Sequence, residues 1–402
     1  MKITNYLPEE VNYCKICTYS NQRPSSTVEF KSKKNDKKEL IKFKDGICDA
    51  CHFAEIKNNE IDWSKREEEL HKLCDAHRSK DGSYDCVIPG SGGKDSFYAS
   101  HILKNKFGMH PITVTWAPHL YTDIGLQNFN SWIESGFDNI LFSPNRNVHR
   151  LLTKLAFENL LHPFQPFIIG QKQVAPKIAN QYGISLIFYG DNPAEHGNNI
   201  EENFNPKMKR EFYSGEKNLE NLSLSGYSGK ELIESFNLNI NDLEPYFPIS
   251  LNDVKKNEIE VHYLSYYLKW DPQECYYYSI ENSNFRPSPE RTEGSYSKYS
   301  SIDDKIDCLH YYTTFIKFGI GRATYDTSQE IRNGKITREE AIPLIKNYDG
   351  ERPKKYLKEC LEYMSIDEDD FNRIIDKFRP KHLWKKSNQN LWELKSPIWK
   401  SN

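Results

Sequence analysis

Short apolar runs alternate with amphipathic stretches along the first half of the chain. The apolar runs have the length and the β-branched or aromatic content of buried strands, and they are residues 84–88, 111–116, 139–142 and 185–189. The stretches with apolar positions at helical spacing are residues 95–107, 126–135, 147–161 and 170–182. This alternation predicts an α/β fold, with a parallel sheet covered by helices on both faces and ligands at the carboxyl ends of its strands.

The chain shows different patterns on either side of this region. Residues 1–60 are rich in lysine and cysteine with weak periodicity, and residues 62–78 follow as a charged helix. Residues 197–245 are polar and indicate an insertion or a lid, and the chain is mainly helical from residue 252. Further helix starts are expected at Ser301, Thr337 and Ser365, the last two with the pattern of a capping box. We expect three domains, residues 1–60, 61–250 and 251–402.

A glycine-rich loop, PGSGGKDS at residues 89–96, lies between a predicted strand and a predicted helix. Glycines let the backbone approach an anion and direct its N–H groups toward it, and the helix N-terminus adds partial positive charge. Ser91 and Ser96 supply hydroxyls, and Lys94 a mobile cation expected on an exposed loop. A Walker A loop would need Gly in place of Ile88 and Ser or Thr in place of Asp95. The loop therefore predicts a phosphate site of another kind, or else a turn without a ligand.

The segment SGGKDS resembles the PP-loop of the ATP pyrophosphatase family, whose fold is of the adenine-nucleotide alpha-hydrolase type. The resemblance implies that the loop grips the pyrophosphate end of ATP and leaves the α-phosphate open to attack. The loop residues expected to bind ATP are Ser91, Gly92, Gly93, Lys94, Asp95 and Ser96. Asp95 either caps its helix or holds Mg²⁺ against the phosphates.

Two other strand ends are expected at the same rim. Thr115 ends the second strand, where the family places adenine, and Gly190 and Asp191 follow the fourth. Asp191 is a candidate for holding Mg²⁺ or the ribose, and Glu195 or His196 could move a proton. Each of these side chains is otherwise a solvated loop residue.

The pairs Cys14-x-x-Cys17 and Cys48-x-x-Cys51 predict a structural metal site. Four thiolates can surround one Zn²⁺ tetrahedrally and leave no open position, as in a zinc ribbon. An iron–sulfur cluster or a redox-active thiol pair are the alternatives. The nine cysteines are odd in number, which favours metal binding in a reducing compartment over disulfides.

The overall composition excludes some function classes. The net charge of −3 lacks the basic footprint of a nucleic-acid-binding protein. No run reaches the roughly 18 apolar residues of a membrane span, and the N-terminus lacks the apolar region of a signal peptide. We therefore expect a cytoplasmic protein that binds neither nucleic acid nor membrane.

The second half combines charge with glycine around residues 291–326. These residues predict a pocket for phosphate or carboxylate, or else a solvated helix face with paired charges. The candidates for substrate binding are Glu293, Ser295, Lys298, Asp304, Lys317 and Arg322. Arg322 is the first choice because it follows two glycines and its fork can grip an oxyanion in two places. The catalytic candidates are Lys94, Asp95, Asp191 and Arg322, and Arg322 is placed against either the sugar or the phosphates of ATP.

The phosphate loop, the cysteine pairs and the segments YGDNPAEHG, RTEGSYSKYSSIDDKIDCLHYYTTFIKFGIGRATYD and EIRNGKITREEA together resemble the N-acetyl sugar amidotransferases. That family acts on bacterial surface sugars such as pseudaminic-type acids and O-antigen sugars. The resemblance implies that an acetamido group on a sugar or sugar nucleotide becomes an acetamidino group. Adenylation of the amide oxygen makes AMP the leaving group, and ammonia then expels it. It also implies ATP, Mg²⁺ and structural Zn²⁺, and ammonia from a separate glutaminase paired with a cyclase-like subunit.

Two rival functions stay open from the residues alone. A PP-loop enzyme that thiolates tRNA would also carry cysteine knuckles, but the slightly acidic balance and the lack of a clear catalytic cysteine pair disfavour it. A non-catalytic zinc-ribbon scaffold would bind nucleotide without releasing pyrophosphate.

Overall fold

The computed structural model describes residues 6–25, 39–196 and 204–400. Within them, five parallel strands form a central sheet in the order β5-β4-β3-β6-β9. The strands are β3 (Cys86–Pro89), β4 (Pro111–Trp116), β5 (Asp138–Phe142), β6 (Leu186–Tyr189) and β9 (Glu260–Tyr263). The predicted α/β fold with a parallel sheet is confirmed.

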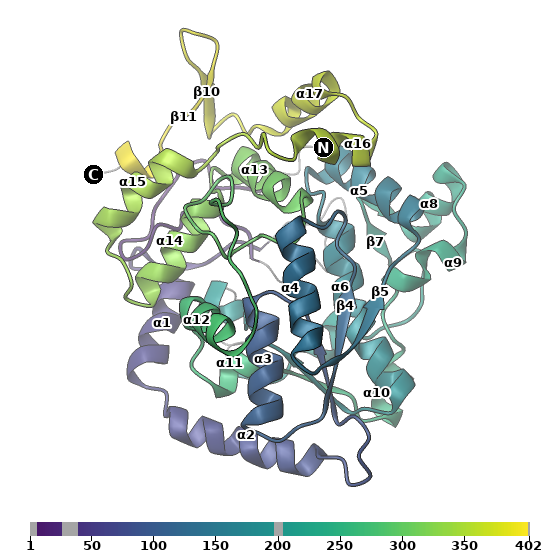
Figure 1. Ribbon diagram of the computed structural model, residues 1–402. Coiled ribbons are helices and arrows are strands. Elements are labelled where there is room, and N and C mark those ends of the chain that lie inside the picture. The colour runs from purple at the N-terminus through teal and green to yellow at the C-terminus, as the bar shows by residue number, and fades with distance from the viewer. Residues whose placement is uncertain (1–5, 26–38, 197–203, 401–402) are drawn as a thin grey trace.

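Helices cover both faces of the sheet because successive strand residues point to opposite sides. Val87, Ile187 and Val261 pack into one apolar core with α5 and α6, whereas Ile88 and Phe188 pack into another with α2 and α3. These helices are α2 (Trp63–His77), α3 (Lys94–Asn105), α5 (Arg146–Leu160) and α6 (Gln165–Tyr182). Figure 1 shows them packed around the sheet. Because both faces of the sheet are covered by apolar cores, groups that contact a ligand are expected at the ends of the strands.

The strand order creates a crevice beside β3. From β3 the chain builds β4 and then β5 on one side, and it then crosses to β6 on the other side of β3. Val87 pairs with Ile187 across this boundary. The loops that leave β3 and β6 therefore diverge, and ligands bind in such a crevice at the carboxyl ends of the strands.

Three predictions of secondary structure require correction. The helix expected to start at Ser301 starts at Ile306 instead, as α13 (Ile306–Phe318). The strand β9 was missed, because residues 252 onward were predicted to be helical. Ser365 does not start a helix. It ends α16 (Leu357–Met364) with a left-handed φ of 53°, and Asp367 caps α17 (Glu368–Phe378) instead. The capping box at Thr337 is confirmed at the start of α15 (Arg338–Tyr348).

The described part of the polar segment, residues 204–245, packs against the α5 and α6 side of the sheet. It contributes Leu224 and Leu232 to the core there, and Ser225 N–H donates to Gln165 Oε1 at 2.8 Å. Its regular elements are β7 (Ser223–Leu224), β8 (Tyr227–Ser228), α8 (Gly229–Phe236) and α9 (Ile240–Leu243), and α10 (Leu251–Lys256) and the short α11 (Leu264–Tyr267) follow. The segment is therefore an insertion built into the core.

The remaining helices and strands lie outside the central sheet. They are β1 (Phe43–Lys44), β2 (Ile47–Cys48), α1 (Asp49–Asn59), α4 (Asp123–Glu134), α12 (Pro272–Asn282), α13 (Ile306–Phe318), α14 (Arg322–Arg332), β10 (Trp384–Lys386) and β11 (Trp392–Leu394). Trp384 docks the C-terminal hairpin, since its Nε1 donates to Ile316 O at 2.9 Å. Among the described helices, none combines the length and apolar character needed to cross a membrane.

The buried carboxylate of Asp304 joins the loop after β4 to the start of α13. It lies 2.7 Å from both the backbone nitrogen and the ring Nδ1 of His119, and it accepts hydrogen bonds from Leu120 N and Ile306 N. The neighbouring backbone pairs too, because Lys305 N donates to Leu120 O at 2.9 Å. A β-carbon on Gly125 would lie 2.5 Å from Asp303 Cα, so the segment rests directly on α4. We call this set of contacts the Asp304 clamp.

Replacing Asp304 with Ala should lower the free energy of unfolding by about 3–5 kcal/mol, because it leaves a buried donor set without its acceptor. Urea denaturation followed by tryptophan fluorescence measures this loss. The matched control is Glu281→Ala, an exposed acid on α12 that should change stability by less than about 0.5 kcal/mol. Equal stability of the two variants would contradict the clamp.

Candidate active site

The loop from Gly90 to Gly93 joins β3 to α3 at the crevice. Gly92 has a φ of 86°, and a β-carbon there would lie 2.6 Å from the Phe129 Cα, so only glycine fits both the conformation and the space. Ser96 closes the loop internally, accepting from Gly92 N at 3.2 Å and donating to Gly93 O at 3.0 Å. The loop is therefore held in place by its own hydroxyl, and α3 presents its N-terminus at the crevice.

Lys94 and Asp95 occupy the first turn of α3. Lys94 is buried, which corrects the expectation of an exposed loop lysine, and its Nζ lies 2.5 Å from Asp95 Oδ2. Burial lowers the pKa of Lys94, but the Asp95 carboxylate outweighs this, so the pKa is raised and the side chain stays cationic. Asp95 does not cap α3, whose N-cap is Gly93. Its Oδ1 is buried and accepts no hydrogen bond within the described residues.

A cavity of about 240 Å³ opens in front of the loop. One wall is formed by Ser91, Gly93, Lys94 and Asp95, and α4 contributes Gly125 and Asn128. The opposite wall comes from the second half of the chain: Tyr299, Ser300, Ser301, Ile302, Asp303, Asp307 and Arg322. The structure thus joins the phosphate loop and the glycine- and charge-rich segment in one site.

Two carboxyl groups of this wall have raised pKa values. Burial raises the pKa of Asp303, against the opposing effect of a hydrogen bond with the Ser91 hydroxyl. Burial raises the pKa of Asp307 to about 7, although the cation of Arg322 pulls it down. Asp307 can therefore gain or lose a proton near neutral pH, as an acid or base in catalysis must.

Arg322 is fixed by contacts on α13 and α14. Its Nε lies 2.9 Å from Asp326 Oδ1, its Nη1 donates to the Tyr311 hydroxyl, and its guanidinium carbon stands 4.5 Å from the Tyr311 ring centroid. Asp326 also accepts a hydrogen bond from Ser295 Oγ at 2.5 Å. These contacts orient a cation at the N-terminus of α14, where it lines the cavity.

The other predicted substrate residues lie elsewhere around the site. Ser295 is buried and bonded to Asp326, and Asp304 forms the clamp. Lys317 is buried and donates to Leu160 O, whereas Lys298 donates to Pro289 O. Glu293 accepts from two backbone N–H groups of residues 354–355. Of the six predicted residues, Arg322 is the one that lines the 240 Å³ cavity.

Asp303 and Asp307 were not among the residues predicted from the sequence to form the site. Both stand in the quoted segment SSIDDKID, between a predicted helix start and the helix itself. The signal was an acidic pair followed by a third acid one helical turn later. Nothing in the chain pattern told which of Asp303, Asp304 and Asp307 would be paired and which would face a cavity.

The rim beyond β6 carries a second unpaired carboxylate oxygen. Asp191 Oδ2 lies 2.5 Å from His196 Nε2, and Oδ1 is buried without a partner within the described residues. A β-carbon on Gly190 would stand 3.7 Å from Asp95 O, so this rim adjoins the phosphate loop. Thr115 is buried within β4, and its hydroxyl accepts from Asn139 Nδ2 at 3.0 Å.

Glu195 at this rim is engaged by α1. It is buried and forms an ion pair of 2.9 Å with the buried Lys57, which also donates to Trp270 O at 2.5 Å. Burial raises the pKa of Glu195, and Lys57 opposes this effect. The contact joins the N-terminal cysteine segment to the crevice rather than leaving Glu195 free in a solvated loop.

The four cysteines predicted as ligands converge. Cys14, Cys17, Cys48 and Cys51 are buried, with all four sulfurs within 4.8 Å of one another. The Cys14–Cys51 and Cys17–Cys48 sulfur distances are 3.8 and 3.6 Å. Sulfurs at tetrahedral corners about 2.3 Å from a zinc ion stand about 3.8 Å apart, so the cluster could hold a structural zinc.

The cysteine segment packs on α14, the helix that carries Arg322. Thr18 Oγ1 lies 2.7 Å from Ser328 Oγ and 3.1 Å from Thr327 Oγ1. At the far end of α14, buried Arg332 stands 5.0 Å from the Tyr19 ring centroid. Burial lowers the pKa of Arg332, but the larger combined effect of Tyr19 and the cysteine sulfurs raises it. The pKa is therefore raised overall, and the side chain stays cationic beside the cluster. The cysteine cluster thus supports one wall of the cavity.

Comparison with known proteins bears on the second half of the chain. Residues 293–397 match the family model described as LPS biosynthesis protein WbpG-like, C-terminal domain. The matched segment contains Asp303, Asp307 and Arg322 of the cavity wall. None of the curated proteins matches the chain. Residues 293–397 are therefore similar to a domain of LPS biosynthesis proteins.

We expect one zinc ion per chain in freshly purified protein, measured by elemental analysis. Cys48→Ser should release the metal and lower the melting temperature, because metal binding contributes to folding. Cys308→Ser is the matched control, a cysteine outside the cluster that should keep the full metal content. Iron in place of zinc, or metal retained by Cys48→Ser, would show that the cluster has another role.

The raised pKa of Asp307 predicts a pH-dependent difference in stability between the wild type and Asp307→Asn. The folded state holds the Asp307 proton up to about pH 7, whereas the unfolded chain releases it near the ordinary pKa of an aspartate, 3.8. This contribution to stability is full below the unfolded pKa and is lost as the pH rises through the folded pKa. The free energy of unfolding of the wild type, measured by urea denaturation, should therefore fall relative to the variant as the pH rises from 3.8 to about 7. Parallel curves would mean that Asp307 does not titrate in this range.

Proposed function

We propose that this chain is an ATP-dependent amidotransferase of bacterial surface-sugar biosynthesis. It would convert the acetamido group of a sugar or sugar nucleotide to an acetamidino group and release AMP and pyrophosphate. The observation that carries the proposal is the shared cavity, in which the phosphate loop faces the segment similar to WbpG-like LPS biosynthesis proteins. Lys94 and Arg322 supply positive charge from opposite walls, as an ATP-consuming site requires.

The proposed chemistry balances in two steps. The amide oxygen attacks the α-phosphorus of ATP, a P–O bond forms, and the bond to pyrophosphate breaks. Ammonia then adds to the activated carbon, and the C–O bond breaks so that AMP leaves with the former amide oxygen. Activation is needed because an amide oxygen is a poor leaving group, and the enzyme contributes orientation and charge neutralisation.

The residues support distinct parts of this scheme. The N–H groups of the loop and Lys94 would hold the pyrophosphate end of ATP, with Ser91 beside them. Arg322, held by Asp326, would neutralise the α-phosphate or an anionic part of the sugar. Asp307 has the pKa to accept a proton from the added nitrogen.

Mg²⁺ fits this site through its unpaired carboxylate oxygens. Asp95 Oδ1 and Asp191 Oδ1 are buried without partners in the described structure, and hard oxygen ligands are what Mg²⁺ prefers. When bound, the ion would neutralise phosphate charge. Thr115, predicted to contact adenine, lies within β4 with its hydroxyl bonded to Asn139, so contact through the hydroxyl would require that bond to break.

The rival functions receive less support. A tRNA-thiolating enzyme needs a reactive thiol at the ATP site, yet the described lining of the cavity contains no cysteine. Cys275 of α12, which packs on α3, is buried, and burial raises the pKa of its thiol. A non-catalytic scaffold has no use for a carboxyl group poised near neutral pH. We keep the proposal that ammonia comes from a separate glutaminase with a cyclase-like subunit in the cytoplasm.

The experiment incubates the chain with ATP, an ammonium salt and a panel of N-acetyl sugars and their nucleotide derivatives. We expect AMP, pyrophosphate and an amidine detected by mass spectrometry. Lys94→Ala should reduce turnover by about 10²–10³-fold, because it removes the buried cation at the phosphate loop. Ser91→Ala should reduce it in the same direction. Detection of ADP and phosphate would reject the assignment.

Arg322→Lys tests the opposite wall, because it keeps the charge and loses the fork. We expect turnover to fall by about tenfold or more. The melting temperature, measured on the same protein, separates a loss of ligand contacts from a loss of the contacts with Asp326 and Tyr311. Lys298→Ala is the control, since Lys298 donates to Pro289 O outside the cavity and should behave as wild type. If Arg322→Lys keeps wild-type sugar affinity and turnover, Arg322 is a structural partner of Asp326 and not a ligand-binding residue.

A further inference from the structure

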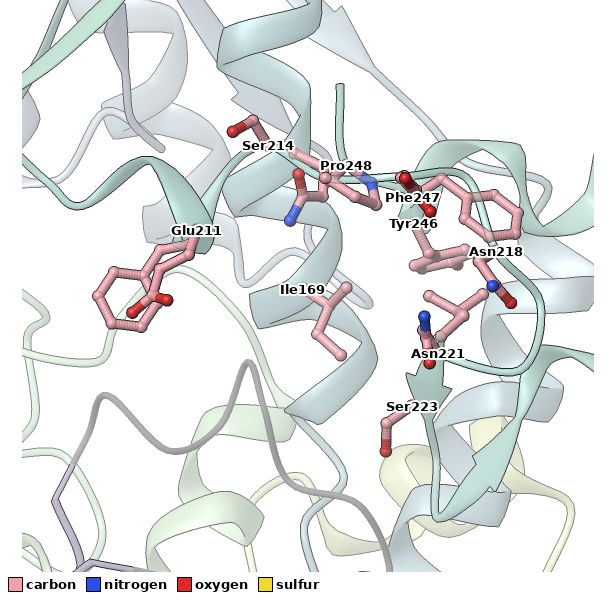
Figure 2. Close-up of a pocket in the computed structure, with 14 residues that line it drawn as sticks. Ile169, Glu211, Ser214, Asn218, Asn221, Ser223, Tyr246, Phe247 and Pro248 are labelled. Carbon is pink, nitrogen blue, oxygen red and sulfur yellow. The ribbon is translucent and has the colours of Figure 1, made fainter. Parts of the chain in front are cut away.

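A second cavity, of about 320 Å³, lies over α6 on the side of the sheet away from α3. Its floor is α6 at Ile169 and Gln173, and its walls are residues 211–223 and 246–248. Figure 2 shows Ile169 between Glu211 on one side and Asn218, Asn221 and Tyr246 on the other. None of the described residues that line this cavity lines the phosphate-loop cavity. The proposed reaction therefore uses none of the residues that line this cavity.

The floor contains a buried acceptor that lacks a donor. Gln173 is 6% exposed, and its Oε1 accepts no hydrogen bond within the described residues. A buried amide oxygen in this state is unfavourable unless a ligand or an ordered water supplies an N–H or O–H group. Because Gln173 lines the cavity, a molecule inside it is in a position to supply that group.

The polar lining selects against anions. Amide and hydroxyl groups come from Asn218, Asn221, Ser214 and Ser223, and carboxylates from Glu211 and Glu216. The described lining has no lysine or arginine, and the nearby Lys217, 5.5 Å from the Phe247 ring centroid, is paired with Glu244, so the charged groups of the lining itself, Glu211 and Glu216, are unfavourable for an anion. A ligand with several hydroxyl donors and no net charge suits the amide oxygens of this lining.

The apolar part of the lining supplies flat, rigid walls. Tyr246 is 1% exposed, and its hydroxyl lies 2.8 Å from Nδ1 of the buried His149. Its ring also meets Trp116 edge-on, with centroids 5.6 Å apart. Phe247 and Pro248 continue the wall. These rings are themselves buried, so they hold the wall in place, while the polar groups of the lining supply the contacts for a ligand.

We propose that this cavity is a binding site for an uncharged saccharide unit, separate from the phosphate-loop cavity. At the floor, Gln173 Oε1 accepts a hydrogen bond from a hydroxyl of the sugar. At the wall, Asn221 contacts the same sugar. The site gives the protein a second point of contact with a carbohydrate, distinct from any group that reacts. It stands on the cavity and on Gln173, and it holds whether or not the phosphate-loop cavity performs the proposed reaction.

The test measures binding of glucose and N-acetylglucosamine to the full chain by saturation-transfer NMR and calorimetry. Gln173→Leu removes the buried acceptor at similar size, and Asn221→Leu fills the wall from an exposed position that should not disturb folding. We expect saturable binding to the wild type and a loss of affinity of about tenfold or more in each variant. The matched control, Gln171→Leu, alters the same residue type on the same helix outside the cavity and should bind as wild type. Arg322→Lys should also bind as wild type.

Four results would overturn the proposal. They are no saturable binding of either sugar, unchanged affinity in Asn221→Leu, loss of binding in Arg322→Lys, and tighter binding of N-acetylneuraminic acid or spermidine than of the neutral sugars. The first would leave an ordered water as the partner of Gln173 Oε1. The third would place the sugars in the phosphate-loop cavity. Melting temperatures of all variants separate lost binding from lost folding.

Discussion

The Asp304 carboxylate is the contact on which the architecture of the site depends. It is buried, and it receives donors from His119, Leu120 and Ile306, so the loop after β4 and the start of α13 are held together across nearly half the chain. A buried carboxylate with this many donors is stable, whereas the same donors without it would be left unpaired. Because α13 is fixed here, Asp303 and Asp307 on either side of Asp304 face the phosphate loop. The cavity exists because the sheet and the second half are joined at this point.

The cysteine cluster acts on the same cavity from the opposite end of α14. Thr18 bonds to Ser328 in the middle of that helix, and Arg332 at its end stays cationic beside the cluster. Four thiolates around one divalent ion carry excess negative charge, which Arg332 is placed to offset. At the other end of α14, Arg322 reaches the cavity. The cysteine cluster lies outside the cavity lining, yet it contacts the helix that positions Arg322 at the cavity.

Local patterns predicted the local parts of this structure and missed the parts set by distant contacts. The strand–loop–helix around residues 89–96 and the two cysteine pairs follow from glycine conformation and ligand spacing, which are short-range. The strand β9 was missed because a four-residue strand at the sheet edge leaves little periodicity to detect. Ser365 has the letters of a capping box but ends the preceding helix instead. The burial of Lys94 depends on a wall contributed from some 200 residues away, which no local pattern contains.

Asp304 and Asp307 show how one short segment produces two different carboxyl groups. Both lie at the start of α13, and their environments differ in the number of donors. Asp304 meets three backbone N–H groups and the His119 ring, so its charge is satisfied and its role is structural. Asp307 faces the cavity, where burial raises its pKa to about 7 and Arg322 prevents a further rise. A buried carboxyl group with a raised pKa lowers the stability of the folded state at neutral pH. Such groups cluster at sites where they act on a ligand. The donors around these two residues are therefore unequally distributed, which leaves Asp307, and not Asp304, as the carboxyl group able to exchange a proton with a ligand in the cavity.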